Sequence, residues 1–206
     1  MAAIIFDMDG TIADSFDYVA EFMAEEAGKA PLTEEQKQRL RGLSMIDMAR
    51  RLGYHWWDGP RLLFKGQRRM RRDIKQLDSF EGIPEIIRKL SAEGHELFVL
   101  STNSSRNIQQ FLHDQKINKY FLEIYGGVGI FGKASALKQL LKKQNLAVKQ
   151  AVYVGDELRD IQAAQSIGMK AVAVSWGFAH RSGLLALRPT AIVDTPDELM
   201  RTLEEI

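Results

Sequence analysis

The segment from Ala2 to Thr11 constrains this chain most, because a short apolar run leads directly into two aspartates and then a glycine. Ala2 to Phe6 is uncharged, contains isoleucine and phenylalanine and is followed by turn residues, which predicts a buried strand. Side chains alternate along an extended chain, so we expect Asp7 and Asp9 on the same side at the end of that strand. The pattern predicts two carboxylates in one small site.

Two neighbouring carboxylates repel each other, so Asp7 and Asp9 require a cation between them or a shared proton. The chain has no cysteine and only four histidines, so Mg²⁺ with oxygen ligands is the cation that we expect. A simple aspartate and glycine turn after the strand is the structural alternative. Motifs elsewhere in the chain must decide between the two interpretations.

Charge and hydrophobic content limit the possible partners. With 206 residues and 45% hydrophobic content, the chain can bury a core and form one domain, or one domain with an insertion. Its 28 basic and 27 acidic residues give a net charge of +1, from which we expect no nucleic-acid partner and no membrane partner. The chain has no cysteine and begins with neither a basic leader nor a long apolar segment, so we expect a soluble, cytoplasmic protein.

Residues 14–81 show helical spacing and no strand pattern. Apolar residues at intervals of three and four predict a first helix between Phe16 and Met23. Further helices are expected from Thr33, where Thr-Glu-Glu-Gln has the pattern of a capping box, from Ser44 to Leu52 and from Arg61 to Gln76, with a loop over residues 54–60. These features predict a small helical unit inserted after the first strand.

From residue 82 onward, predicted strands and helices alternate, which is typical of a parallel, doubly wound sheet. Strands are expected at 97–100, 121–125, 151–154, 171–174 and 191–193, and helices at 84–93, 106–115, 134–144, 160–167 and from 196. Helical crossovers make the strands parallel, so their carboxyl ends should share one edge. We therefore predict an α/β fold: a doubly wound, Rossmann-like core from residues 1–13 and 82–206, with an all-helical cap from residues 14–81.

Polar residues follow several of these predicted strands, at the edge where ligands bind in open parallel sheets. Besides Asp7 and Asp9 they are Ser101, Thr102, Asn103 and Ser104, then Lys133, and then Asp156 and Asp160. Turn formation and helix capping are the structural alternatives for the hydroxyl and acidic residues. Lys133 is different, because a cation at a helix N-terminus opposes the helix dipole, and a bound anion would account for it.

Taken together, four motifs in this order resemble those of the haloacid dehalogenase (HAD) superfamily: Asp7-Met8-Asp9-Gly10-Thr11, Ser101 or Thr102 with Asn103, Lys133, and Gly155-Asp156 with Asp160. The resemblance covers essentially the whole chain. The helical insertion resembles the α-helical cap of the subgroup that includes phosphoglycolate phosphatases and β-phosphoglucomutases. That family has one Ser or Thr in its second motif; the spacing to Ile117 favours Ser101, whereas the Thr-Asn pair common in phosphoglycolate phosphatases favours Thr102, so both stay candidates.

The resemblance implies an enzyme, a Mg²⁺-dependent phosphatase similar to phosphoglycolate phosphatase, which hydrolyses a small phosphorylated metabolite through an aspartyl phosphate. By the same resemblance Asp7 is the nucleophile, and Asp9 is the general acid and base. The implied Mg²⁺ ligands are Asp7, Asp156 and the backbone carbonyl of Asp9, with Asp160 in support. The implied phosphate-binding residues are Ser101 or Thr102, Asn103 and Lys133.

Two alternative functions remain open at this stage. A phosphomutase of the β-phosphoglucomutase type has the same core and differs in what the cap admits. A signalling phosphoacceptor domain also combines acids, Mg²⁺, Ser or Thr and Lys, but the spacing of Asp7 and Asp9 and the helical insertion count against it. Dehalogenases lack the second acid, so Asp9 counts against them. The expected partner is a small phosphorylated substrate, and the expected state is a monomer or weak homodimer.

The predicted helix from Arg61 carries seven cations and one acid, Asp73. Four of these cations, Arg61, Lys65, Arg68 and Arg72, recur at intervals of three and four and so form one stripe. A solvated helix face is one interpretation of this stripe. The other is that it overhangs the strand ends and binds a second anionic group of the substrate, such as the carboxylate of phosphoglycolate.

Overall fold

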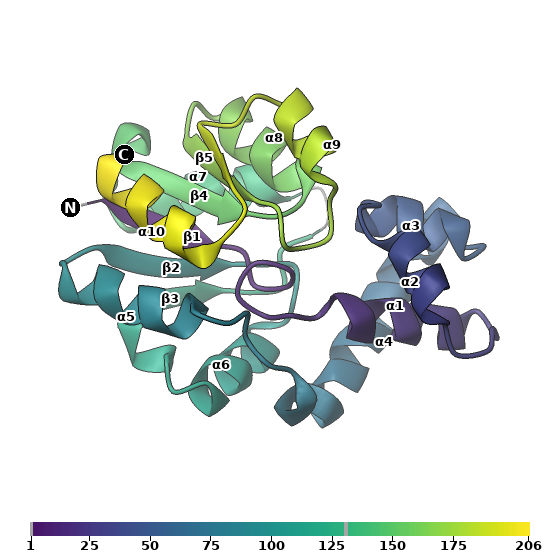
Figure 1. The fold of residues 1–206 in the computed structure, drawn as a ribbon. Coiled ribbons are helices and arrows are strands. Elements are labelled where there is room, and N and C mark those ends of the chain that lie inside the picture. The colour runs from purple at the N-terminus through teal and green to yellow at the C-terminus, as the bar shows by residue number, and fades with distance from the viewer. Residues whose placement is uncertain (1, 130–131) are drawn as a thin grey trace.

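A computed structural model describes residues 2–129 and 132–206 of the chain. Its centre is a six-stranded parallel sheet in the order β3-β2-β1-β4-β5-β6 (Figure 1). The strands are β1 Ala3–Phe6, β2 Glu96–Leu100, β3 Phe121–Tyr125, β4 Ala151–Gly155, β5 Lys170–Val174 and β6 Ala191–Val193. In the register, Phe6 of β1 lies beside Val99 of β2 and Val154 of β4. The predicted α/β class and doubly wound sheet are confirmed.

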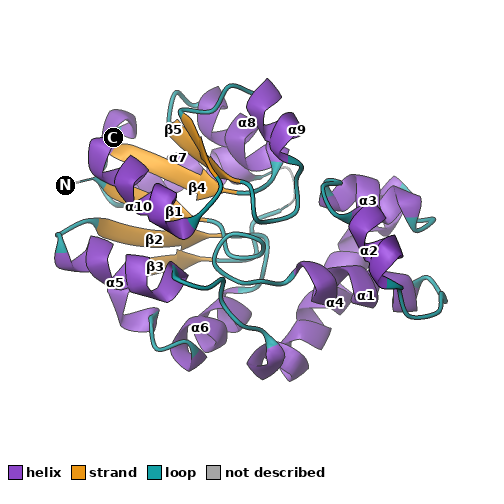
Figure 2. Ribbon diagram, in the orientation of Figure 1, coloured by secondary structure: helices purple, strands orange, loops and turns teal. Residues whose placement is uncertain are grey.

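Helices cover both faces of the sheet (Figure 2). Ile4 and Phe6 of β1 pack on one face, against residues of α5 (Ile83–Ala92), α6 (Ser105–Asp114) and α10 (Pro196–Glu205). Ala3 and Ile5 pack on the other face, against residues of α7 (Lys133–Lys143), α8 (Leu158–Ser166) and α9 (Arg181–Ala186). Because β1 is buried on both faces, it contains apolar residues throughout and places the residues after it at the centre of the sheet edge.

Four helices lie between β1 and α5, to one side of the sheet (Figure 1). They are α1 Phe16–Glu26, α2 Glu34–Leu40, α3 Met45–Arg51 and α4 Gly59–Asp73, with single 3₁₀ turns at Trp56–Asp58 and Ile74–Gln76. They share a hydrophobic cluster that includes Phe16, Met23 and Met48 and to which Phe178 of the core also belongs. Throughout this article we call residues 14–81 the insertion.

The insertion leaves and rejoins the core through two paired segments. The amide of Asp14 donates to the carbonyl of Asp78 at 2.9 Å, and the amide of Phe80 donates to the carbonyl of Ile12 at 3.0 Å. An antiparallel bridge joins Ala13 to Ser79 between them. The two connections therefore meet directly beside the end of β1.

The predicted element boundaries differ from the observed ones by at most two residues, except that α1 ends three residues later and α4 three residues earlier than predicted. Helix α4 begins at Gly59 rather than Arg61, because Pro60 is tolerated in the first helical turn, where no amide partner is required. Part of the expected loop at 54–60 is a 3₁₀ turn. Helix α9 was not predicted, since its six residues are too few to show a helical period. Among the described residues, none of the helices combines the length and apolar content needed to cross a membrane.

Candidate active site

The chain turns sharply directly after β1. The amide of Asp7 still donates to the carbonyl of Val154 at 2.9 Å, and the carbonyl of Met8 then accepts from the amides of Ile12 and Ala13, each at 2.9 Å. Gly10 adopts a φ of +78°, and a Cβ there would overlap the carboxylate of Asp156. Glycine is required at this position both for the backbone angle and because the loop that follows β1 lies very close to the loop that follows β4.

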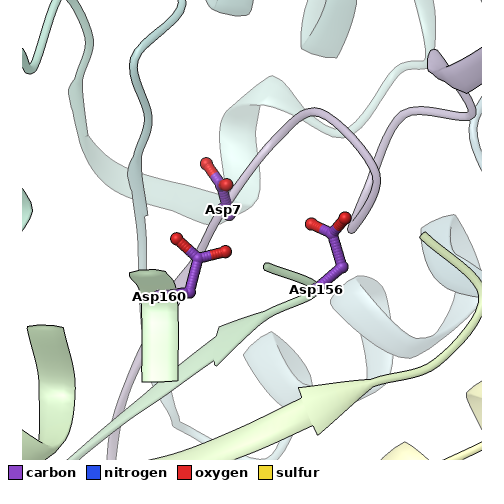
Figure 3. Close-up of side chains that lie close together, drawn as sticks. All are labelled: Asp7, Asp156 and Asp160. Carbon is purple, nitrogen blue, oxygen red and sulfur yellow. The ribbon is translucent and has the colours of Figure 1, made fainter. Parts of the chain in front are cut away.

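Three buried carboxylates meet at this edge of the sheet (Figure 3). Asp7 follows β1, Asp156 follows β4, and Asp160 lies in the first turn of α8. One oxygen from each lies within 4.8 Å of the others. Asp156 accepts from the Thr11 hydroxyl at 2.9 Å and from the Phe178 amide at 2.7 Å. The structure thus unites three of the predicted site residues.

Lys133 lies against this acidic cluster. It is the first residue of α7, and its buried Nζ donates to Asp7 Oδ2 at 2.7 Å and also to Asp160. Burial lowers the pKa of Lys133, but the Asp160 and Asp7 carboxylates outweigh it and hold the pKa above its ordinary value. From the sequence we expected a bound anion to explain this lysine. In the structure the anions are the carboxylates of Asp7 and Asp160, and they offset the unfavourable interaction of the lysine with the helix dipole.

The acidic cluster has three carboxyl groups for the one ammonium group of Lys133. Burial raises the pKa of Asp156, as do the Asp160, Glu157 and Asp7 carboxylates, and burial raises that of Asp160 to about 6 although Lys133 opposes the shift. The Oδ1 of Asp7 is buried without a hydrogen-bond partner among the residues described. Three buried carboxylates gathered around one ammonium group form a donor set that fits a hard divalent cation such as Mg²⁺. Asp7, Asp156 and Asp160 are the residues that could hold it.

Asp9 lies outside this cluster. Its Oδ2 accepts from the side-chain amide of Asn103 at 2.9 Å, and its buried Oδ1 has no hydrogen-bond partner in the described part of the chain. Burial and the Asp7 carboxylate raise the pKa of Asp9 to about 6, although the bond from Asn103 opposes the shift. A carboxyl group with this pKa can be protonated near neutral pH, as a general acid must be. The side chain of Asp9 thus lies apart from the three carboxylates that could hold a metal ion, and its pKa is suited to proton exchange near neutral pH.

The residues after β2 have separate hydrogen-bonding roles. Ser101 Oγ accepts from the Asn103 amide at 3.2 Å, and the carbonyl of Thr102 accepts from Gln67 of α4 at 2.8 Å. Both hydroxyl residues are buried, and both remain candidates for the second motif. Ser104 caps α6, as the capping alternative predicted.

Helix capping was also the structural alternative for Asp160. Its Oδ2 accepts from the amide of Glu157, which caps α8, while its Oδ1 pairs with Lys133. The structure confirms the helix interpretation of Asp160, and it places the same side chain in the acidic cluster. One carboxylate can serve the helix and the site together because each of its oxygens accepts separately.

Sequence reasoning missed several polar residues around the site. The buried Glu157 and the partly exposed Arg159 form an ion pair next to Asp156, with Arg159 Nη2 2.5 Å from Glu157 Oε1. Burial lowers the pKa of Arg159, but the nearby carboxylates raise this pKa by a larger amount, so the guanidinium stays charged. Asn107 is also buried, and it links α6 to α4. The sequence could have indicated Asn107, because a polar residue beside Ile108 on the apolar face of a helix must have a buried hydrogen-bond partner.

The stripe of cations on α4 does not point to the strand ends. Gln67 and Met70 are the residues of α4 that contact the loop after β2. Arg68 and Arg72 are exposed, with no ion pair among the described residues, while Lys65 pairs with Glu26 of α1. The structure favours the interpretation of a solvated helix face.

Comparison with known proteins agrees with this geometry. A sequence model described as "Haloacid dehalogenase-like hydrolase" matches residues 4–174. A phosphoglycolate phosphatase of Synechococcus elongatus is 36% identical over 209 residues, covering 100% of this chain and 99% of its own, and one of Aliivibrio fischeri is 26% identical over 97% of this chain and 95% of its own. A haloacid dehalogenase-like hydrolase from Streptococcus pneumoniae shares the fold, with a TM-score of 0.80, 23% identity and 98% coverage of each chain.

Proposed function

The chain belongs to the haloacid dehalogenase-like hydrolase family, and on that basis we propose that it is a Mg²⁺-dependent phosphatase that hydrolyses a small phosphate monoester of the phosphoglycolate type. One observation carries the proposal: Asp7 has one oxygen paired with Lys133 and the other buried without a partner among the described residues, beside Asp156. That free oxygen is a nucleophile held in a defined direction.

In the first step, Asp7 Oδ1 attacks phosphorus, so a bond forms between that oxygen and phosphorus while the bond to the ester oxygen breaks. Asp9 donates its proton to the departing alkoxide, from an Oδ1 that has no hydrogen-bond partner among the described residues. In the second step, Asp9 takes a proton from water, and the resulting hydroxide attacks phosphorus while the bond between phosphorus and Asp7 Oδ1 breaks. Phosphate leaves, and both carboxyl groups return to their starting states.

Lys133 and the hydroxyl of Ser101 or Thr102 would hold the phosphoryl oxygens and stabilise the charge on them, an effect worth about 3 to 4 kcal/mol per donor in similar sites. Asp7, Asp156 and Asp160, with the carbonyl of Asp9, would hold Mg²⁺. When bound, Mg²⁺ supplies positive charge that offsets repulsion between the nucleophile and the phosphoryl group.

The substrate class rests on the relatives named above, of which the one from Synechococcus elongatus spans the whole chain. Phosphoglycolate carries a carboxylate as well as a phosphate. The small monoester is the partner that we propose, while the cytoplasmic location and the monomeric or weakly dimeric state stay predictions.

Phosphate release measured with an aryl phosphate, phosphoglycolate and a panel of sugar phosphates would test the proposal. We expect many turnovers per enzyme with Mg²⁺, none in excess EDTA, and recovery when Mg²⁺ is restored. A phosphoacceptor domain would stop at one equivalent, and a phosphomutase would return a rearranged sugar phosphate rather than free phosphate. Full activity in EDTA would remove the metal from the mechanism.

A further inference from the structure

A continuous set of hydrogen bonds leads from α4 of the insertion to Asp9. Asn107 Nδ2 donates to the backbone carbonyl of Gln67 at 2.8 Å and to Asn103 Oδ1 at 3.0 Å. Asn103 Nδ2 in turn donates to Asp9 Oδ2 at 2.9 Å and to the sulfur of Met70 at 2.8 Å. Helix α4 thus contacts both asparagines, and only the second touches Asp9.

The direction of each amide in this chain of bonds is determined by its neighbours. Asn103 Oδ1 accepts from the backbone amide of Ser104 at 2.9 Å, which is a donor only, so the oxygen must lie there and the NH₂ group must face Asp9. Both groups that Asn107 Nδ2 contacts, the Gln67 carbonyl and Asn103 Oδ1, are acceptors, so its NH₂ group is likewise assigned. Reversing either side-chain amide would place two donors or two acceptors against each other.

Burial makes the loss of any of these hydrogen bonds costly in free energy. Asn103, Asn107 and Met70 are all buried, so a lost partner is not replaced by bulk water. Asn103 uses both of its hydrogens and accepts twice, which holds the side chain in one position. Asp9 Oδ2 is thereby occupied, and Oδ1 is left as the oxygen that can exchange a proton.

We propose that Asn107 and Met70 are positioning residues: by holding Asn103, they direct the Asp9 carboxyl toward the leaving group when α4 is seated on the core. The proposal rests on the proposed function and extends it. Displacement of α4 removes one partner from each asparagine, and Asp9 then loses the restraint on its orientation. Proton transfer is therefore coupled to the seating of the insertion.

The test depends on the leaving group. An alkyl phosphate requires a proton on its departing oxygen, whereas a nitrophenyl phosphate departs readily without one. Asn107→Leu and Met70→Leu keep the number of non-hydrogen side-chain atoms and remove the polar partners. Gln115→Leu is the matched control, because Gln115 follows α6 and bonds to Leu77 and Ser79 at the end of the insertion, with no link to Asp9.

With Mg²⁺ present, we expect Asn107→Leu to lower kcat/KM for the alkyl phosphate by about tenfold, a fraction of the full general-acid effect. Met70→Leu should act in the same direction by a smaller factor. The values for nitrophenyl phosphate, and both values for Gln115→Leu, should stay within about twofold of the wild type. An equal loss on both substrates, or none on either, would overturn the proposal and leave only a structural role for these residues.

A second measurement needs no turnover. The side-chain amide hydrogens of Asn103 should exchange slowly with solvent in the wild type and rapidly in Asn107→Leu, as followed by NMR with Mg²⁺ present. Unchanged protection in Asn107→Leu would also overturn the proposal. If the wild type hydrolyses no phosphate ester, the proposed function fails, while the exchange experiment still decides whether Asn107 holds Asn103.

Discussion

The core and the insertion use the same charged residue types in opposite ways. In the core, the side chains of Lys133 and Asp7 are only 2% and 3% exposed and form an ion pair at the sheet edge. In the insertion, those of Arg39 and Glu35 are 67% and 75% exposed and pair along one helix. A buried pair costs about 3 to 5 kcal/mol when one partner is removed, whereas an exposed pair contributes about 0 to 1 kcal/mol. The buried pair of the core therefore lies in the site, whereas the pair in the insertion lies on the surface.

The contacts between the two regions differ again. Gln67 and Asn107 join α4 to the core through neutral hydrogen bonds, and the amide of His180 donates to the carbonyl of Gly42 at 3.2 Å. Gly42 has a φ of +88°, and a Cβ there would overlap the His180 ring. Neutral bonds of this kind contribute about 1 kcal/mol each, so they can be made and broken during turnover. The comparison teaches that buried charge holds the reactive groups of the core, whereas the hydrogen bonds between the insertion and the core are neutral and individually weaker.

The comparison predicts that one substitution, aspartate to asparagine, has very different results in the two regions. Asp7→Asn should lower kcat by about 10⁴-fold or more on every substrate, because an amide is not a nucleophile. Asp47→Asn, in α3 of the insertion, should leave kcat within about twofold. Circular dichroism would check that both variants fold. Substantial turnover by Asp7→Asn would remove the covalent step from the mechanism.

Asp9→Asn tests the second core acid and should have the next largest effect. It removes a proton donor while preserving shape, so kcat/KM for an alkyl phosphate should fall by about 10² to 10⁴. The loss for a nitrophenyl phosphate should be smaller, because that leaving group needs little protonation. Steady-state kinetics on the two esters would measure the difference, and a rate near that of the wild type on the alkyl ester would exclude Asp9 as the acid.

Lys133→Met tests whether the core pair is as costly to break as its burial indicates. Removing the ammonium leaves Asp7 and Asp160 buried without their cation, so the free energy of unfolding should fall by about 3 to 5 kcal/mol. Lys138→Met, at an exposed position of the same helix, should change it by less than about 0.5 kcal/mol. Urea denaturation without Mg²⁺ would measure both. Equal effects would contradict the distinction between buried and exposed charge.

The smallest effects are expected on the cationic stripe of α4. Arg68→Ala and Arg72→Ala should change KM for phosphoglycolate by less than about twofold, because these exposed side chains lie on a helix whose Gln67 and Met70 face the core. Nitrophenyl phosphate serves as the reference substrate. A selective rise in KM for phosphoglycolate would show instead that the stripe binds the substrate carboxylate.

Local patterns were sufficient for much of this structure. The apolar run before Asp7 predicted β1, and Thr33 with Gln36 forms the predicted capping box. Helix α9 escaped prediction because six residues do not display a period. The stripe containing Arg68 and Arg72 was visible in the sequence, but its direction was not, since a helical period does not say which face meets the core.

The sequence by itself determined the order of strands and helices, the insertion after β1 and the polar residues at the strand ends, because period and turn chemistry act over a few neighbouring residues. Only the tertiary structure decided which of those residues meet. Lys133 reaches Asp7 across 126 positions of the chain, and Asn103 reaches Asp9 across 94. Such contacts depend on how parallel strands align at one edge and on how α4 is seated, and no local pattern contains that information.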